Sequence, residues 1–209
     1  MNQISELAIA LPVLLFSVIV HECAHGWTAE KFGDPTARLM GRLTLNPLPH
    51  IDPFGTVLLP ILLAVAHSPI MIGWAKPVPV NFQNLRNPKK DILWVGISGP
   101  VANILMAIIS GLLLKVDFVF AIAPIRYMLA VSIQINVILA VFNMIPIPPL
   151  DGSRFVYSLL PDKLAHYYGS LERYGFFILL IMLYTGMLNI FISPLYYSVM
   201  YIFHFLKIL

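Results

Sequence analysis

The chain of 209 residues is 59% hydrophobic and only 11% charged, with a formal net charge of +3. These values exclude a soluble domain with an ordinary polar surface, in which about 25% of the residues are charged. The basic residues are scattered and form no stripe with interleaved aromatic residues, which argues against nucleic-acid binding. We therefore expect a single integral-membrane domain, residues 1–209, in contact with the lipid bilayer.

The first predicted membrane helix begins with the apolar run Leu7–Val20 and continues into His21-Glu22-Cys23-Ala24-His25. The apolar run alone would cover ~21 Å of a ~30 Å hydrocarbon core. The helix can therefore cross only if this motif lies in or at the edge of the bilayer. No basic region or cleavage site precedes the run, so we expect a retained helix rather than a signal peptide.

The motif places ionisable side chains where they favour metal binding. Residues four apart share one face of a helix, so His21 and His25 can bind one ion while Glu22 stands beside an open coordination position. A histidine pair that merely packs in a core is less tenable here, because ionisable groups are costly at membrane depth. Cys23 is interpreted as a packing residue. A catalytic zinc site takes three protein ligands, so one more must come from elsewhere in the chain.

The polar loop of residues 27–52 follows this helix. Its basic residues are Lys31, Arg38 and Arg42. The positive-inside rule places this loop in the cytoplasm. We interpret His50 as a loop residue and Asp52 as a helix cap rather than as metal ligands.

The next apolar run, Phe54–Ala66, is too short for a full span and has basic residues on both flanks. A re-entrant or short membrane helix fits it better than a crossing. Within the following segment, Gly73–Asn81, the alternating Val78-Pro79-Val80 predicts a small extended strand. Its prolines prevent pairing on both edges.

Three further apolar segments predict full spans, at Ile92–Leu114, Tyr127–Ile145 and Phe176–Ile192. Asn103, an amide in the first of these, needs a partner in hydrocarbon, which is either another helix or a substrate backbone. The tail after Pro194 either extends the last span with a kink or lies in the membrane interface. The expected fold is thus an all-α polytopic membrane protein with about four transmembrane helices, the short membrane helix and the strand.

The chain leaves the Tyr127–Ile145 span through Pro146-Ile147-Pro148-Pro149-Leu150-Asp151-Gly152. Three prolines in four positions cannot continue a helix, so we expect unwound chain that presents Asp151 on extended backbone. Asp151 is the candidate third ligand. The alternative interpretation of Asp151-Gly152 is an ordinary turn dipeptide.

Topology tests this candidate independently. Basic residues after the first helix place the N-terminus outside and His25 toward the cytoplasm. If residues 54–72 re-enter without crossing, Asp151 returns to the side of His21 and His25. If they crossed, Asp151 would emerge on the opposite face and the site could not close.

Two motifs together resemble the site-2 protease family of intramembrane zinc metalloproteases, most closely its compact prokaryotic branch. They are His21-Glu22-Cys23-Ala24-His25 and the pattern Asn143-x-x-Pro-x-x-x-Leu-Asp-Gly that ends at Gly152. The likeness extends through further segments: Gly41–Pro47, Gly73–Asn81 and Ser98-Gly99-Pro100. We expect no PDZ or CBS domain, because the chain is short.

The resemblance implies Zn²⁺ as the cofactor, with His21, His25 and Asp151 as its ligands. It also implies Glu22 as the general base and Asn143 as a residue that assists substrate or oxyanion binding. The expected activity is hydrolysis of peptide bonds within or near transmembrane segments of membrane-protein substrates. Another protease could trim the substrate first.

We further expect Val78, Val80 and Asn103 to contact substrate, and the active site to face the cytoplasmic side of the cell's plasma (inner) membrane. A rival interpretation is a non-catalytic zinc-binding membrane scaffold or a metal transporter. A transporter needs a path open to both faces, whereas here the ionisable cluster lies at one end only.

Overall fold

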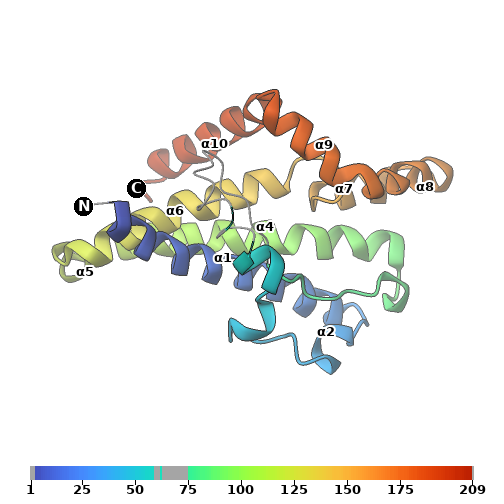
Figure 1. The fold of residues 1–209 in the computed structure, drawn as a ribbon, viewed down its shortest axis with the longest axis horizontal. Coiled ribbons are helices and arrows are strands. Elements are labelled where there is room, and N and C mark those ends of the chain that lie inside the picture. Colours follow the sequence, from blue (N-terminus) through green and yellow to red (C-terminus); the bar gives the residue numbers. More distant parts are fainter. Residues whose placement is uncertain (1–2, 59–61, 63–74, 209) are drawn as a thin grey trace.

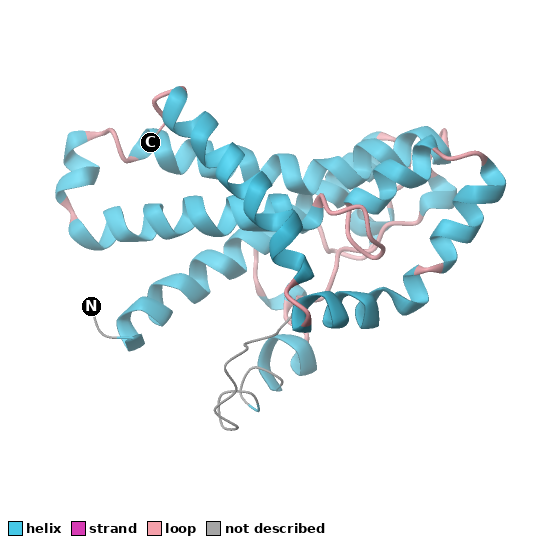
Figure 2. Cartoon of the chain, turned by 90° about the horizontal axis from the view of Figure 1, so that it is seen from above, coloured by secondary structure: helices cyan, strands magenta, loops and turns pink. Residues whose placement is uncertain are grey.

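The computed structural model describes residues 3–58, 62 and 75–208, and this part of the chain consists of helices joined by loops (Figures 1 and 2). Three long helices form its centre: α1 (Gln3–Lys31), α4 (Pro88–Leu113) and α6 (Ala123–Asn143). Helix α4 packs against both α1 and α6. Helices α1 and α6 run in the same direction and α4 runs in the opposite one (Figure 1).

Four helices of the described part are long and apolar enough to cross a membrane, namely these three and α10 (Met187–Phe205). This supports the expected multi-pass membrane protein. Helix α1 continues without a break through the histidine motif to Lys31, as the short apolar run required. A buried cluster joins α4, α6 and α10; its members are Ala107, Ile133, Val137, Val141 and Phe203.

Shorter elements fill the connections. They are α2 (Thr36–Leu39), η1 (Leu48–His50), the π-helical η2 (Pro53–Leu58), η3 (Phe82–Asn84), α5 (Asp117–Ala121), α7 (Gly152–Leu159), α8 (Asp162–Ser170) and α9 (Glu172–Tyr184). The C-terminal ends of α1 and α6 and the start of α4 lie at one end of the bundle (Figure 1). Asp151 therefore returns to the end of α1 that carries the histidines.

The last predicted span, Phe176–Ile192, is wrong in its position. Helix α9 ends at Tyr184 and the chain turns at Gly186, whose φ of 74° is a left-handed conformation that glycine adopts without strain. The long apolar helix is instead α10, and Pro194 lies inside it rather than ending it. The tail after Pro194 is therefore the larger part of a helix long enough to span.

The predicted strand at Val78-Pro79-Val80 is not seen. Residues 75–81 have no regular secondary structure, and no strand occurs in residues 3–58 or 75–208. The re-entrant segment predicted at Phe54–Ala66 lies mostly outside the described residues, apart from the π-helical turn at its start.

Candidate metal centre and active site

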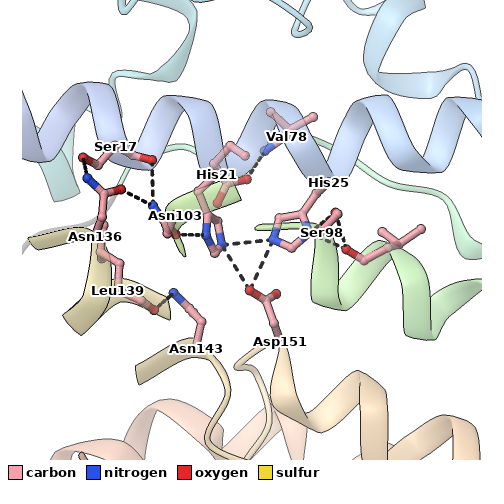
Figure 3. A network of polar contacts seen from close by, with 12 residues as sticks. Ser17, His21, His25, Val78, Ser98, Asn103, Asn136, Leu139, Asn143 and Asp151 are labelled. Atoms are coloured by element: carbon pink, nitrogen blue, oxygen red, sulfur yellow. Dashed lines mark hydrogen bonds and ion pairs between the residues drawn. The ribbon is translucent and has the colours of Figure 1, made fainter. Parts of the chain in front are cut away.

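Three side chains from two distant parts of the chain converge on one another (Figure 3). His21 and His25 lie one turn apart on α1, with their Nε2 atoms 3.0 Å from each other. The Asp151 Oδ2 atom lies 3.0 Å from Nε2 of His21 and 3.3 Å from Nε2 of His25. Both histidines are buried. The structure thus brings together the three residues that the sequence proposed as metal ligands.

Asp151 reaches this position from the first residue before α7. Its backbone is helical, with φ −60° and ψ −34°, so the expected extended backbone is wrong. The chain does leave α6 through irregular structure, because the prolines end the helix at Asn143. Gly152 is required by a close approach: a Cβ atom there would lie 2.3 Å from the carbonyl oxygen of Met144.

The orientation of His25 follows from its second ring nitrogen. Its Nδ1 lies 2.6 Å from the carbonyl oxygen of Val95 on α4. A carbonyl only accepts hydrogen bonds, so Nδ1 carries the proton and donates it. The lone pair of Nε2 is then free and points at Asp151 and His21.

A chain of amides fixes His21 in the same way (Figure 3). The Asn136 amide nitrogen donates to the Ser132 carbonyl at 2.9 Å, which turns its oxygen toward Asn103. The Asn103 amide nitrogen donates to that oxygen at 2.8 Å and to the Ser17 carbonyl at 3.3 Å. Its own Oδ1 therefore accepts from Nδ1 of His21, at 2.5 Å. The lone pair of Nε2 of His21 is free as well.

Two imidazole lone pairs and a carboxylate oxygen thus face one another, and a metal cation bound between them would relieve their repulsion. The Asp151 Oδ2 atom is buried and accepts no hydrogen bond from the described residues. Tetrahedral zinc with nitrogen and oxygen ligands at ~2.0–2.2 Å sets those ligands roughly 3.3 Å apart, close to the observed 3.0–3.3 Å. The donor set and its spacing therefore fit zinc.

Space for this cluster comes from Gly99 on α4. A Cβ atom there would lie 2.5 Å from Nε2 of His25 and 2.6 Å from two ring atoms of His21. Ser98-Gly99-Pro100 is one of the segments through which the sequence resemblance extends. The structure shows that Gly99 leaves room for the two histidine rings of the candidate metal site.

A cavity of about 450 Å³ opens beside the cluster. The three candidate ligands line it together with Glu22, the segment Pro77–Val80, Asn143, Arg154 and Glu172. Glu22 accepts a hydrogen bond through Oε2 from the N–H of Val78, at 2.8 Å. Among the described residues, no group donates a hydrogen bond to its Oε1, which leaves that atom able to accept a proton.

The segment beside Glu22 is held from its other side. Arg42, which is buried, donates to the carbonyls of Lys76 and Pro77 at 2.8 and 3.1 Å. The N–H of Asn81 donates to Asp34 at 2.7 Å. No main-chain hydrogen bond of Val80 is present among the described residues. Hydrogen bonds thus hold this segment near both of its ends.

Asp34 anchors this segment from the turn after α1. Burial raises the pKa of its carboxyl, but hydrogen bonds from Thr36, Asn84 and the N–H of Asn81 outweigh it and hold the pKa below the ordinary value. The carboxylate form of Asp34 is therefore coupled to the position of the cavity wall.

Of the remaining residues predicted to contact substrate or the oxyanion, some line the cavity and one does not. Val78 and Val80 line the cavity. Asn143 also lines it, but its amide donates to the Leu139 carbonyl of its own helix at 3.0 Å. Asn103 is fully buried away from the cavity and positions His21, so the structure does not place it against a substrate. Sequence reasoning missed the role of Asn136, although an amide inside a membrane helix was the signal for it.

Comparisons with known proteins identify the family. The model of Peptidase family M50 matches residues 117–185. "Putative zinc metalloprotease YwhC" of Bacillus subtilis is 38% identical over 186 residues, which cover 84% of this chain and 81% of YwhC. The chain belongs to peptidase family M50. The resemblance to the site-2 proteases is thereby confirmed, including the part of the chain that carries Asp151.

More distant relatives agree with this assignment. A protein of the same type named Rip2, from Mycolicibacterium smegmatis, is 30% identical over 84% of this chain and 66% of its own length. "Zinc metalloprotease MJ0392" of Methanocaldococcus jannaschii is 28% identical over 90% of this chain and 46% of its own length. No solved structure gives a significant match. The family and these names support a zinc-dependent protease.

Proposed function

We propose that this protein is an intramembrane zinc metalloprotease that hydrolyses peptide bonds within or near transmembrane segments of membrane-protein substrates. The observation that carries the proposal is the convergence of two free imidazole lone pairs and the Asp151 carboxylate in one cavity with Glu22. Family membership and the names of the relatives support the zinc chemistry. The place of this cavity at the end of long apolar helices supports a membrane-embedded substrate.

Each residue has a distinct role in this proposal. His21, His25 and Asp151 hold Zn²⁺, which when bound supplies Lewis-acid activation of water and of the scissile carbonyl. Glu22 takes the proton of the attacking water at Oε1 and later delivers it to the leaving amine. Asn143 reaches the developing oxyanion only if its amide leaves the Leu139 carbonyl.

The substrate must unwind before attack, because helical carbonyls are hidden in i to i−4 hydrogen bonds. The segment Pro77–Asn81 is suited to hold the unwound chain. The N–H of Val78 donates to Glu22, and the N–H of Asn81, three residues further on, donates to Asp34. In extended chain, residues two apart turn their N–H groups to the same side, so we infer that Val80 shares the cavity side with Val78. A substrate strand can pair there by β-augmentation.

We infer that the active site faces the cytoplasmic side of the plasma (inner) membrane. The positive-inside rule supports this orientation, because the basic loops lie at the same end as the cavity. The partners are then transmembrane protein substrates that enter the site from the lipid bilayer. Where a substrate needs prior trimming, an upstream protease is a further partner. A metal transporter fits less well. Such a protein needs a second metal-binding step toward the opposite end, and the described residues contain one cluster of this kind.

The deciding experiment compares wild type with Glu22→Gln in detergent, using a broad panel of single-span peptides. We expect both proteins to retain one zinc and only wild type to cleave. Cleavage is followed by mass spectrometry and zinc by elemental analysis. Zinc bound by both proteins with cleavage by neither would favour the scaffold, and equal cleavage by both would remove Glu22 as the base.

A further inference from the structure

The active-site cavity has a charged wall away from the metal cluster. Arg154, on the first turns of α7, forms a two-pronged ion pair with Glu172 at the start of α9. Its Nη1 donates to Oε2 at 3.2 Å and its Nη2 to Oε1 at 3.0 Å. Both side chains line the same cavity as Glu22 and Asp151. The proposed reaction uses neither of them.

Arg154 is the fixed partner of this pair. Its side chain is only 21% exposed and packs so closely on α4 that a Cβ atom at Gly96 would lie 2.8 Å from its own Cβ. The guanidinium also lies 5.1 Å from the centre of the Phe82 ring, a cation–π contact. The base of the Arg154 side chain packs against α4, and its guanidinium lies beside the Phe82 ring. These two contacts hold the guanidinium in the cavity wall.

Glu172 is the movable partner. Its side chain is 44% exposed and lies in the first turn of α9, where rotation carries the carboxylate into solvent. An exposed ion pair of this kind contributes little stability, so exchanging one carboxylate for another costs little. Glu172 therefore shows the geometry in which a carboxylate binds Arg154, and another carboxylate can replace it there.

We propose that Arg154 is a carboxylate-binding subsite of the active site, where a carboxylate of the substrate peptide displaces Glu172. The inference rests on the proposed function and names a substrate class for it: peptides with an acidic side chain or a free C-terminal carboxylate near the scissile bond. A planar guanidinium fits such a group in two-pronged fashion, which gives orientation as well as affinity.

The test measures binding, so that it does not depend on turnover. The probes are dye-labelled, acetylated hexapeptides of valine and asparagine, and the protein is zinc-loaded Glu22→Gln in detergent. One arm replaces each asparagine in turn by aspartate and keeps an amidated C-terminus. A second arm keeps the neutral side chains and frees the C-terminal carboxylate. Fluorescence anisotropy gives the Kd of each peptide.

We expect the carboxylate in one arm to tighten binding about tenfold over the neutral peptide, as a charge-assisted hydrogen-bonded pair does. In the same background, Arg154→Gln abolishes the difference, Arg154→Lys restores part of it, and Glu172→Gln enlarges it by removing the competing carboxylate. The peptide set that shows tighter binding identifies whether Arg154 binds an acidic side chain or a C-terminal carboxylate.

Two results would overturn the subsite: equal binding of every charged and neutral peptide, or a carboxylate preference that survives in Arg154→Gln. Zinc content and helicity of each variant control for misfolding, and Glu172→Gln tests the subsite with Arg154 intact. Failure of the proposed function looks different, because wild type would then cleave no panel peptide whatever the binding preference.

Discussion

At the scale of single residues, the metal site depends on groups that are not themselves ligands. Val95 and the amides of Asn103 and Asn136 decide which nitrogen of each histidine carries the proton. The network includes the main-chain carbonyls of Val95, Ser17 and Ser132, which can only accept hydrogen bonds. The side chains beyond the ligands therefore prepare Nε2 of both rings for metal.

Replacing Asn103 by leucine removes the acceptor that orients His21. We expect zinc affinity to fall about 10–100-fold, the usual effect of losing such an outer partner. Competition with a chromophoric chelator measures it. Gln134→Leu is the matched control, because Gln134 is an exposed amide on α6. Wild-type affinity in Asn103→Leu would contradict the positioning role.

Gly99→Ala places a methyl group within 2.6 Å of both histidine rings. We expect loss of bound zinc with little loss of helix, since alanine favours helices more than glycine does. Elemental analysis and circular dichroism check the two parts. The control is Gly169→Ala on α8, where the added Cβ makes only an ordinary contact at 3.5 Å. Full zinc content in Gly99→Ala would show that the ligands lie elsewhere.

At the scale of elements, the wall segment Lys76–Asn81 is positioned by the turns that follow α1. Arg42 and Asp34 hold it from one side, and Glu22 holds Val78 from the other. The buried carboxylate of Asp34 also accepts from Thr36 and Asn84. The loop residues Asp34 and Arg42 thus shape the wall of the proposed substrate site.

The lowered pKa of Asp34 gives a pH dependence with a definite sign. A carboxyl whose pKa is lower in the folded protein stabilises it above the ordinary value, near 3.8, and loses this contribution as pH falls through the folded pKa. Metal-free Asp34→Asn should therefore unfold more easily than metal-free wild type at pH 7, and the gap should close below pH ~3.8. Thermal unfolding in detergent measures the gap, with the exposed Asp117→Asn as control. A gap that persists at low pH would argue against this coupling.

Val80→Pro removes the N–H that we propose to face the cavity. We expect a rise in KM with unchanged zinc content, because a substrate strand loses a main-chain hydrogen-bond donor. Steady-state kinetics on a panel peptide cleaved by wild type measure the rise. Pro79→Ala, on the opposite side of the chain, is the control and should leave KM unchanged. An unaltered KM in Val80→Pro would exclude strand pairing at this residue.

At the scale of the whole molecule, the metal would join α1 to the loop between α6 and α7. Zinc should therefore stabilise the fold as any ligand of the native state does, by about 2.7 kcal/mol at a hundredfold excess over its Kd. We expect Tm to rise with free zinc in wild type and to stay constant in Asp151→Ala. Magnesium, which prefers oxygen ligands, serves as the control ion. Equal zinc shifts in both proteins would place the metal elsewhere.

Much of this architecture could be predicted from the sequence, for a physical reason. Apolar length located α1, α4 and α6, and positive charge in the loops brought Asp151 to the end of α1 that carries His21 and His25. The α9–α10 break was not placed, because Thr185-Gly186 lies inside a long and mostly apolar run, and an isolated glycine is also tolerated inside a helix. The hydrogen-bond network through Asn103 and Asn136 could not be predicted either. Contacts between helices depend on how each helix is rotated about its own axis, and the hydrophobic pattern of the sequence does not fix that rotation.

The anchoring of Lys76–Asn81 has a further consequence, for the entropy of binding. This segment is already ordered by Arg42, Asp34 and Glu22, so strand pairing would order the substrate alone. Ordering costs roughly 1–2 kcal/mol per residue, and unwinding a helix adds the loss of its internal hydrogen bonds. A membrane segment with glycine or proline near the scissile bond costs less free energy to unwind, because both residues disfavour the helix. Discrimination among transmembrane helices would then depend on how readily each one unwinds.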